Sequence, residues 1–240
     1  MSARRGLYTQ IELDGGAKAA IILAFLLLPL VAIIAADADS TIVSLDFTLS
    51  YVLLTTGLFL NGGQLKVRPR SGQRTGDRPA SQSWLWVFGA LGIFGFAEAF
   101  VPLAFGFVST TYLSSLSLSS ALSIGGLLAI INAISEESFF RYGITNLFTN
   151  VGPRPSVITG IVMSAAAFTL YHAGDITGIV DFSILFVAGL TLAFIGLYTG
   201  RLSVTLAAHG ANNIGVFLFT VIILKPQAVA LILPLVHQFI

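Results

Sequence analysis

Long apolar runs separated by short polar stretches dominate the chain. A transmembrane helix needs about 20 mostly apolar residues. The pattern predicts an all-α, polytopic bundle of about eight transmembrane helices, at 18–36, 42–60, 84–108, 118–148, 156–173, 182–199, 202–224 and 226–239. The last run is short, and the fourth is too long for one straight crossing, so part of it is a candidate to lie at the membrane interface. No internal repeat or separate soluble domain interrupts the pattern, which predicts a single transmembrane domain over 1–240.

Composition supports this interpretation. Hydrophobic residues make up 55% of the 240 positions and charged residues only 10%, whereas soluble domains carry about 25% charged residues. A surface so poor in charge has to face lipid, and we expect no nucleic-acid partner. The chain has no cysteine, which excludes disulfides, thiolate metal sites and a cysteine nucleophile.

The basic residues predict the orientation. With the N-terminus inside, almost all of them fall on the inner side, and Lys225 is the basic residue on the outer side. Basic loops favour the cytoplasmic face, so we expect a protein of the plasma membrane with a cytoplasmic N-terminus. The inner basic residues are Arg4, Arg5, Lys18, Lys66, Arg68, Arg70, Arg74, Arg78, Arg154 and Arg201.

The residues most informative about function are polar and lie inside the predicted spans. A charge at the membrane centre costs at least ~3 kcal/mol on insertion scales, so such residues are functional candidates. Their spacing is helical, because residues four apart share one helix face. The candidates are Glu136, Glu137 and Arg141 in the fourth span, His172 in the fifth, and His209 and Asn213 in the seventh.

Two of these residues pair within the fourth span. Glu137 precedes Arg141 by four positions, an acid-before-base spacing that favours an ion pair and lowers the cost of burying both charges. Glu136 lies about 100° around the same helix and is left for another role.

The three runs Glu-Glu-x-x-x-Arg, Phe-x-x-x-His and His-x-x-x-Asn, on three membrane helices in that order, resemble the pattern of a known family. They are similar to the CAAX-processing and bacteriocin-processing (CPBP, or Abi) intramembrane proteases, which include the type II CAAX prenyl endopeptidase. The resemblance covers about 118–224, the expected catalytic core. It implies an endopeptidase acting on a peptide or a prenylated protein within membrane lipid, with removal of a C-terminal tripeptide as one such activity.

The resemblance also implies roles for the residues. Glu136 resembles the general base, which holds a water together with His172. Glu137 resembles a supporting carboxylate held by Arg141. His209 and Asn213 resemble the groups that face the developing oxyanion, and Phe168 resembles packing behind the histidine.

The residues themselves leave two mechanisms open. Hydrolysis needs a base to take a proton from water, and donors aimed at the oxyanion can contribute about 3–4 kcal/mol. In a metal-free version, Glu136 and His172 activate water directly, and no cofactor is required. In a zinc version, Glu136, His172 and His209 would bind the metal, as in two-His-one-Glu sites. The absence of a His-Glu-x-x-His run favours the metal-free version.

Two other classes of function also use buried carboxylates and histidines. A proton-coupled transporter is one, and a non-catalytic adaptor or bacteriocin-immunity-like membrane protein is the other. A transporter is expected to show inverted repeats, which the sequence lacks.

Counting along upright helices places Glu136, His172 and His209 at different depths, so we expect tilted helices around a water-filled cavity.

Overall fold

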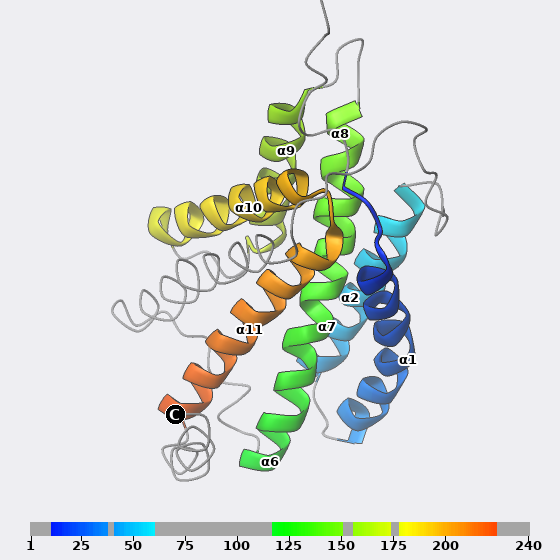
Figure 1. Cartoon of the computed structure of the whole chain (residues 1–240). Helices are drawn as coiled ribbons and strands as arrows, with labels where there is room; N and C mark the ends of the chain where they lie inside the picture. The colour runs from blue at the N-terminus through cyan, green and yellow to red at the C-terminus, as the bar shows by residue number, and fades with distance from the viewer. Residues whose placement is uncertain (1–10, 38–40, 61–116, 151–155, 174–177, 225–240) are drawn as a thin grey trace, which may run out of the picture.

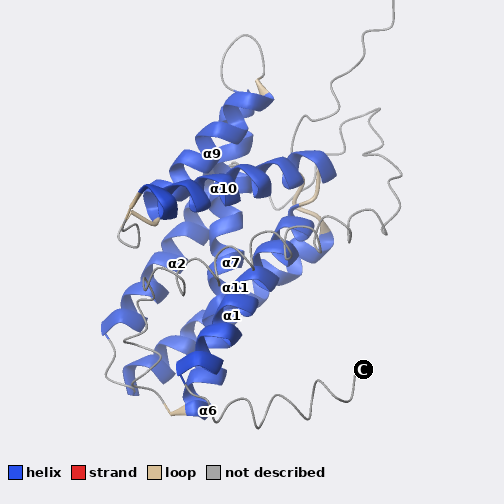
Figure 2. Ribbon diagram, turned by 90° about the vertical axis from the view of Figure 1, so that its left-hand side faces the viewer, coloured by secondary structure: helices blue, strands red, loops and turns tan. Residues whose placement is uncertain are grey.

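The computed structural model describes residues 11–37, 41–60, 117–150, 156–173 and 178–224. Helices account for the regular structure of these residues, apart from an isolated bridge between Glu12 and Arg201. Figures 1 and 2 show the helices gathered into one bundle. The all-α class is confirmed for this part of the chain. The spans expected at 84–108 and 226–239, and most of the basic residues that predicted the orientation, lie outside the described residues.

The described helices coincide closely with the expected spans. Ser156 begins one of them, because its side chain accepts a hydrogen bond from the Thr159 amide at 3.2 Å and so caps the first turn. Gly200 ends another in the left-handed region, with φ of 67°. These helices are α1 (Gly15–Asp37), α2 (Thr41–Leu60), α9 (Val157–Tyr171), α10 (Ile179–Thr199) and α11 (Leu202–Leu224).

The fourth expected span is a single run of helical segments, drawn in green in Figure 1. Two of its segments are π-helical, with hydrogen bonds from residue i to i+5, and such segments are frequent at functional sites. The π segment η3 begins at Glu137, directly after Glu136. The run consists of α6 (Leu118–Ser120), η2 (Ala121–Gly125), α7 (Gly126–Glu136), η3 (Glu137–Thr145) and α8 (Asn146–Asn150).

Small residues bring the helices into close contact. A Cβ added to Gly57 of α2 would lie 2.3 Å from the Ser138 carbonyl oxygen of η3. A Cβ added to Gly189 of α10 would lie 2.9 Å from the Cα of Ala165 in α9. Helices in lipid associate through such small-residue contacts. They hold α2 against η3 and α10 against α9, and so fix the surroundings of the polar residues.

The segment 11–14 at the start of the described chain ties distant elements together. Asn146 of α8 holds the backbone of Ile11 twice, accepting from its amide at 2.9 Å and donating to its carbonyl at 3.0 Å. The Glu12 amide donates to the Gly200 carbonyl at 2.9 Å, and the Leu202 amide donates to the Glu12 carbonyl at 3.1 Å. The segment therefore joins α8 to the turn between α10 and α11.

The helix α10 is long and apolar enough to cross a membrane, with a mean hydropathy of 2.2 over its 18 most apolar consecutive residues. Only 33% of those residues are buried within the protein. By length and composition it is the one such helix in the described part of the chain. Large apolar side chains also point outward from other helices, including Phe59 at 80% exposure and Ile158 at 74%. The expected number of spans is not established by these helices.

Candidate active site

Three of the candidate residues meet at one carboxylate oxygen. Oε2 of Glu136 lies 3.6 Å from Nε2 of His209 and 4.0 Å from Nε2 of His172. Glu136 is 6% exposed, and no described residue donates a hydrogen bond to this oxygen. Both distances exceed a direct hydrogen bond. Two bonds of about 2.8 Å to one water span up to about 5.5 Å, so the three groups lie within reach of a single shared water.

The orientation of each imidazole is fixed by its other nitrogen. Nδ1 of His172 lies 2.9 Å from the Phe168 carbonyl oxygen, which can only accept, so Nδ1 carries a hydrogen. Nδ1 of His209 lies 2.8 Å from Oε1 of Glu137, and it donates there when that carboxyl is ionised. In the neutral rings, Nε2 therefore bears a lone pair directed to the Glu136 side. Such a ring can accept a proton from water.

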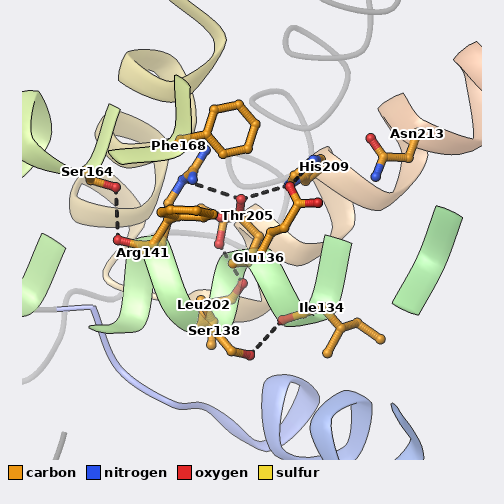
Figure 3. Close-up of polar contacts among 12 residues, drawn as sticks. Ile134, Glu136, Ser138, Arg141, Ser164, Phe168, Leu202, Thr205, His209 and Asn213 are labelled. Atoms are coloured by element: carbon orange, nitrogen blue, oxygen red, sulfur yellow. Dashed lines mark hydrogen bonds and ion pairs between the residues drawn. The ribbon is translucent and has the colours of Figure 1, made fainter. Parts of the chain in front are cut away.

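Glu137 forms a buried charged cluster behind the histidine. Its Oε1 lies 3.3 Å from Nε of Arg141 as well as 2.8 Å from Nδ1 of His209, and both Glu137 and Arg141 are 0% exposed. The contact with Arg141 lies within η3, and the contact with His209 joins η3 to α11; Figure 3 shows Arg141 and His209 on these two elements. The sequence-based pairing of Glu137 with Arg141 is present in the structure, and the cluster orients His209.

Phe168 lies between the cation and the imidazoles. Its ring centroid is 4.6 Å from Cζ of Arg141 and 4.6 Å from the centroid of the His172 ring. The same ring meets His209 edge-on at 5.8 Å. Cation–π contacts of this kind are worth more away from water, about 2 kcal/mol. Phe168 therefore packs against both histidines and Arg141, a wider contact than packing behind one histidine.

Asn213 stands apart from the other candidates. It lies one turn beyond His209 on α11, as Figure 3 shows, and its Nδ2 donates to the Ala129 carbonyl of α7 at 3.2 Å. The amide has a second hydrogen, which can donate to a bound group. The bond to Ala129 ties Asn213 to the backbone of a neighbouring helix, whereas Glu136, Glu137, Arg141 and the two histidines approach one another through their side chains.

The mismatch in depth expected from upright helices does not separate the three residues. His172 is the C-cap of α9 and lies just beyond the end of the helix, and α11 runs obliquely beside the long helical run (Figure 1). Oblique packing brings residues to one level although they lie at different distances from their helix ends. The predicted water-filled cavity is not tested by these contacts and stays a prediction.

One residue that contacts the framework of the site was missed by sequence reasoning. Ser164 of α9 is 0% exposed and donates to the Phe140 carbonyl of η3 at 2.9 Å. Its only signal was its position, four residues before Phe168 and eight before His172 on the same helix face. Serine is common in membrane helices, so this spacing alone would not have selected it.

The side chains that could act as metal ligands are relevant to the alternative mechanism with zinc. Within the described residues, no group of three or more His, Asp or Glu side chains is arranged so as to hold a metal ion. We therefore derive no step through a metal, and zinc binding by Glu136, His172 and His209 stays a prediction.

A family model for the type II CAAX prenyl endopeptidases, described as Rce1-like, matches residues 84–215, more than half of the chain. The chain belongs to this family. The match begins earlier than the resemblance at 118–224 and contains all six candidate residues, from Glu136 to Asn213. It supports an integral membrane protease of the CAAX type in general, and lends no support to the bacteriocin-processing side of the resemblance. No curated protein and no solved structure matches the chain.

Proposed function

We propose that this chain is an intramembrane endopeptidase in which Glu136 activates a water molecule for attack on a peptide bond. The observation that carries the proposal is the approach of both Nε2 atoms, at 3.6 and 4.0 Å, to one oxygen of Glu136. These separations suit one water held between the carboxylate and the rings. The family to which the chain belongs supports proteolysis as the reaction.

The proposed reaction balances with these groups. Glu136 takes one proton from the water, and the water oxygen bonds to the substrate carbonyl carbon, whose π electrons move to its oxygen. The intermediate then reforms the carbonyl, the carbon–nitrogen bond breaks, and Glu136 returns its proton to the leaving amine. His172, through its Nε2 lone pair, orients the water and accepts the proton that the new carboxylic acid loses.

His209 and Asn213 have the role of stabilising the oxyanion in this proposal. His209 must then carry a hydrogen on Nε2 as well as on Nδ1, and the carboxylates of Glu136 and Glu137 balance its positive charge. Asn213 supplies the hydrogen of Nδ2 that Ala129 does not accept. Donors placed in this way can lower the activation barrier by about 3–4 kcal/mol.

We further propose a substrate and a setting. The substrate is a prenylated protein or peptide that loses its last three residues, with its lipid chain lying in the membrane. The protein is a single domain of about eight spans in the plasma membrane, with residues 118–224 as its catalytic core and a cytoplasmic N-terminus. The basic inner loops would then face a cytosolic substrate tail.

The experiment that tests the proposal compares Glu136→Gln with the unaltered protein on a prenylated CAAX peptide. We expect the substitution to lower kcat by about 10²–10⁴-fold, because it removes the base, without lowering the thermal unfolding midpoint. Glu12→Gln serves as the control, since it removes a carboxylate outside the site. Full activity in Glu136→Gln would overturn the mechanism. An unaltered protein without activity on this peptide would favour the adaptor or transporter classes.

Two further arms refine the test. The same peptide without its prenyl group measures how far the lipid contributes to recognition, and equal rates would contradict a prenylated substrate. A strong chelator should leave kcat unchanged in the metal-free mechanism. Loss of activity that added zinc restores would instead favour the zinc site of Glu136, His172 and His209.

A further inference from the structure

One backbone carbonyl in the π segment accepts hydrogen bonds from two buried hydroxyls. The Phe140 oxygen of η3 accepts from Oγ1 of Thr145 at 3.0 Å and from Oγ of Ser164 at 2.9 Å. Both hydroxyl residues are 0% exposed. The buried hydroxyl of Thr169, further along α9, instead bonds to the Ala165 carbonyl of its own helix. Ser164 differs from Thr169 because its bond joins two helices, α9 and η3 (Figure 3).

The bond between Ser164 and Phe140 is one of a series of contacts between α9 and the preceding helical run, which are antiparallel. At one end, a Cβ added to Gly160 would lie 2.0 Å from Oγ1 of Thr149. At the other end, His172 faces Glu136 at 4.0 Å. Ser164 lies between these two contacts, so its bond sits within the stretch that sets how far α9 extends towards Glu136.

The close packing at Gly160 and the hydrogen bond from Ser164 both act on this axial position, and of the two only the bond has a defined donor and acceptor. Lipid tails are as apolar as the helix faces, so apolar surface alone gives neighbouring helices little preference for one axial alignment, whereas a hydrogen bond between helices has a defined length and direction. One helical turn is about 5.4 Å. A slide of even a fraction of that turn would take His172 beyond water-bridging reach of Glu136 or press the two together.

We propose that Ser164 is a positioning residue that sets the axial register of α9 against the π segment, and thereby holds His172 level with Glu136. The acceptor, the Phe140 carbonyl, belongs to the π segment η3. Thr145 holds the same carbonyl from within η3. The catalytic consequence rests on the proposed function, but the register itself does not.

The kinetic test is a double-mutant cycle on the shared acceptor. Ser164→Ala, Thr145→Val and the double variant are assayed with the prenylated peptide, and Thr169→Val is the matched control, because it removes a buried hydroxyl of α9 that bonds only within its own helix. We expect Ser164→Ala to lower kcat by about 10–100-fold, as small misplacements do, with KM changed by less than about twofold. The double variant should lose more than the product of the single effects, because only it removes both side-chain donors from the carbonyl.

A distance measurement tests the register without reference to activity. The chain has no cysteine, so spin labels can be placed at Leu147→Cys on α8 and Ile158→Cys on α9, two exposed positions. Ser164→Ala should shift or broaden the distance distribution between the labels, and Thr169→Val should not. An unchanged distribution in Ser164→Ala overturns the proposal whether or not the protein cleaves the peptide.

The kinetic measurements also distinguish the proposal from its alternatives. Equal losses of kcat in Ser164→Ala and Thr169→Val would overturn the proposal, because the effect would then be a general one of lost buried hydroxyls. A shifted distance together with an inactive unaltered protein would support the register and count against the proposed function alone. Should Ser164→Ala fail to fold, Ser164→Cys is assayed in its place, because its thiol is a weaker donor of similar size. We expect its kcat to fall below that of the unaltered protein, and an unchanged kcat would count against the proposal.

Discussion

The cluster of Glu137, Arg141 and His209 predicts a large and specific cost for removing its cation. Glu137 and Arg141 are 0% exposed, and their charged atoms lie 3.3 Å apart. At an effective dielectric constant of about 20, two unit charges at this distance attract by about 5 kcal/mol. Arg141→Met replaces the guanidinium with an apolar chain and leaves the Glu137 carboxylate without its strongest partner. We expect a loss of about 3–5 kcal/mol in stability, as for other buried pairs from which one member is removed.

The informative comparison is with the variant that removes both charges. The double variant Glu137→Gln/Arg141→Met leaves no unpaired charge, and its new side-chain amide oxygen can still accept from Nδ1 of His209. It should be more stable than Arg141→Met alone, because breaking a buried pair costs more than replacing it with neutral groups. The assay is the thermal unfolding midpoint of purified protein in one detergent. A double variant destabilised by the sum of the single effects would refute the reasoning, since the two charges would then act independently.

Two further predictions concern the framework of the site. Gly57→Ala should lower the unfolding midpoint, because the new Cβ would lie 2.3 Å from the Ser138 carbonyl oxygen in η3. Gly15→Ala is the control, since nothing lies within 4 Å of its new Cβ. Equal midpoints in the two variants would contradict the close contact. Asn146→Ala should lower the free energy of unfolding by about 1–3 kcal/mol, because both hydrogen bonds to Ile11 are lost. The same loss should speed proteolysis near residue 11. An unchanged rate of cleavage there would show that other contacts hold the segment.

Much of the described fold could be predicted from apolar run length. The expected helices at 42–60 and 202–224 agree with α2 and α11 to within one residue, because the runs end where turns and polar residues begin. The pairing of Glu137 with Arg141 was also foreseeable, since a spacing of four puts the two side chains on one helix face. These features depend on local sequence, which hydropathy and helical periodicity describe.

The parts that could not be predicted depend on contacts between distant residues. The π geometry of η3 leaves no mark in the hydropathy of a long apolar run, although Thr145 and Ser164 both bond to the Phe140 carbonyl within it. The bond from Asn213 to Ala129 joins residues of two different helices. Counting along upright helices separated His172 from His209 and led to the expectation of tilted helices. The oblique course of α11 and the position of His172 beyond the end of α9 accompany the approach of both rings to Glu136.

The pairing of segment 11–14 has a consequence for the order of assembly. Ile11 is synthesised before its partner Asn146, which lies 135 positions later in the chain. Glu12 forms hydrogen bonds with the backbone of Gly200 and Leu202, which are synthesised later still. During synthesis Glu12 cannot make its two backbone bonds until the turn between α10 and α11 has been made, whereas Asn146 is available to Ile11 earlier. A nascent chain that ends before the α10–α11 turn would therefore lack both backbone partners of Glu12, and its segment 11–14 would be held by Asn146 alone of these partners.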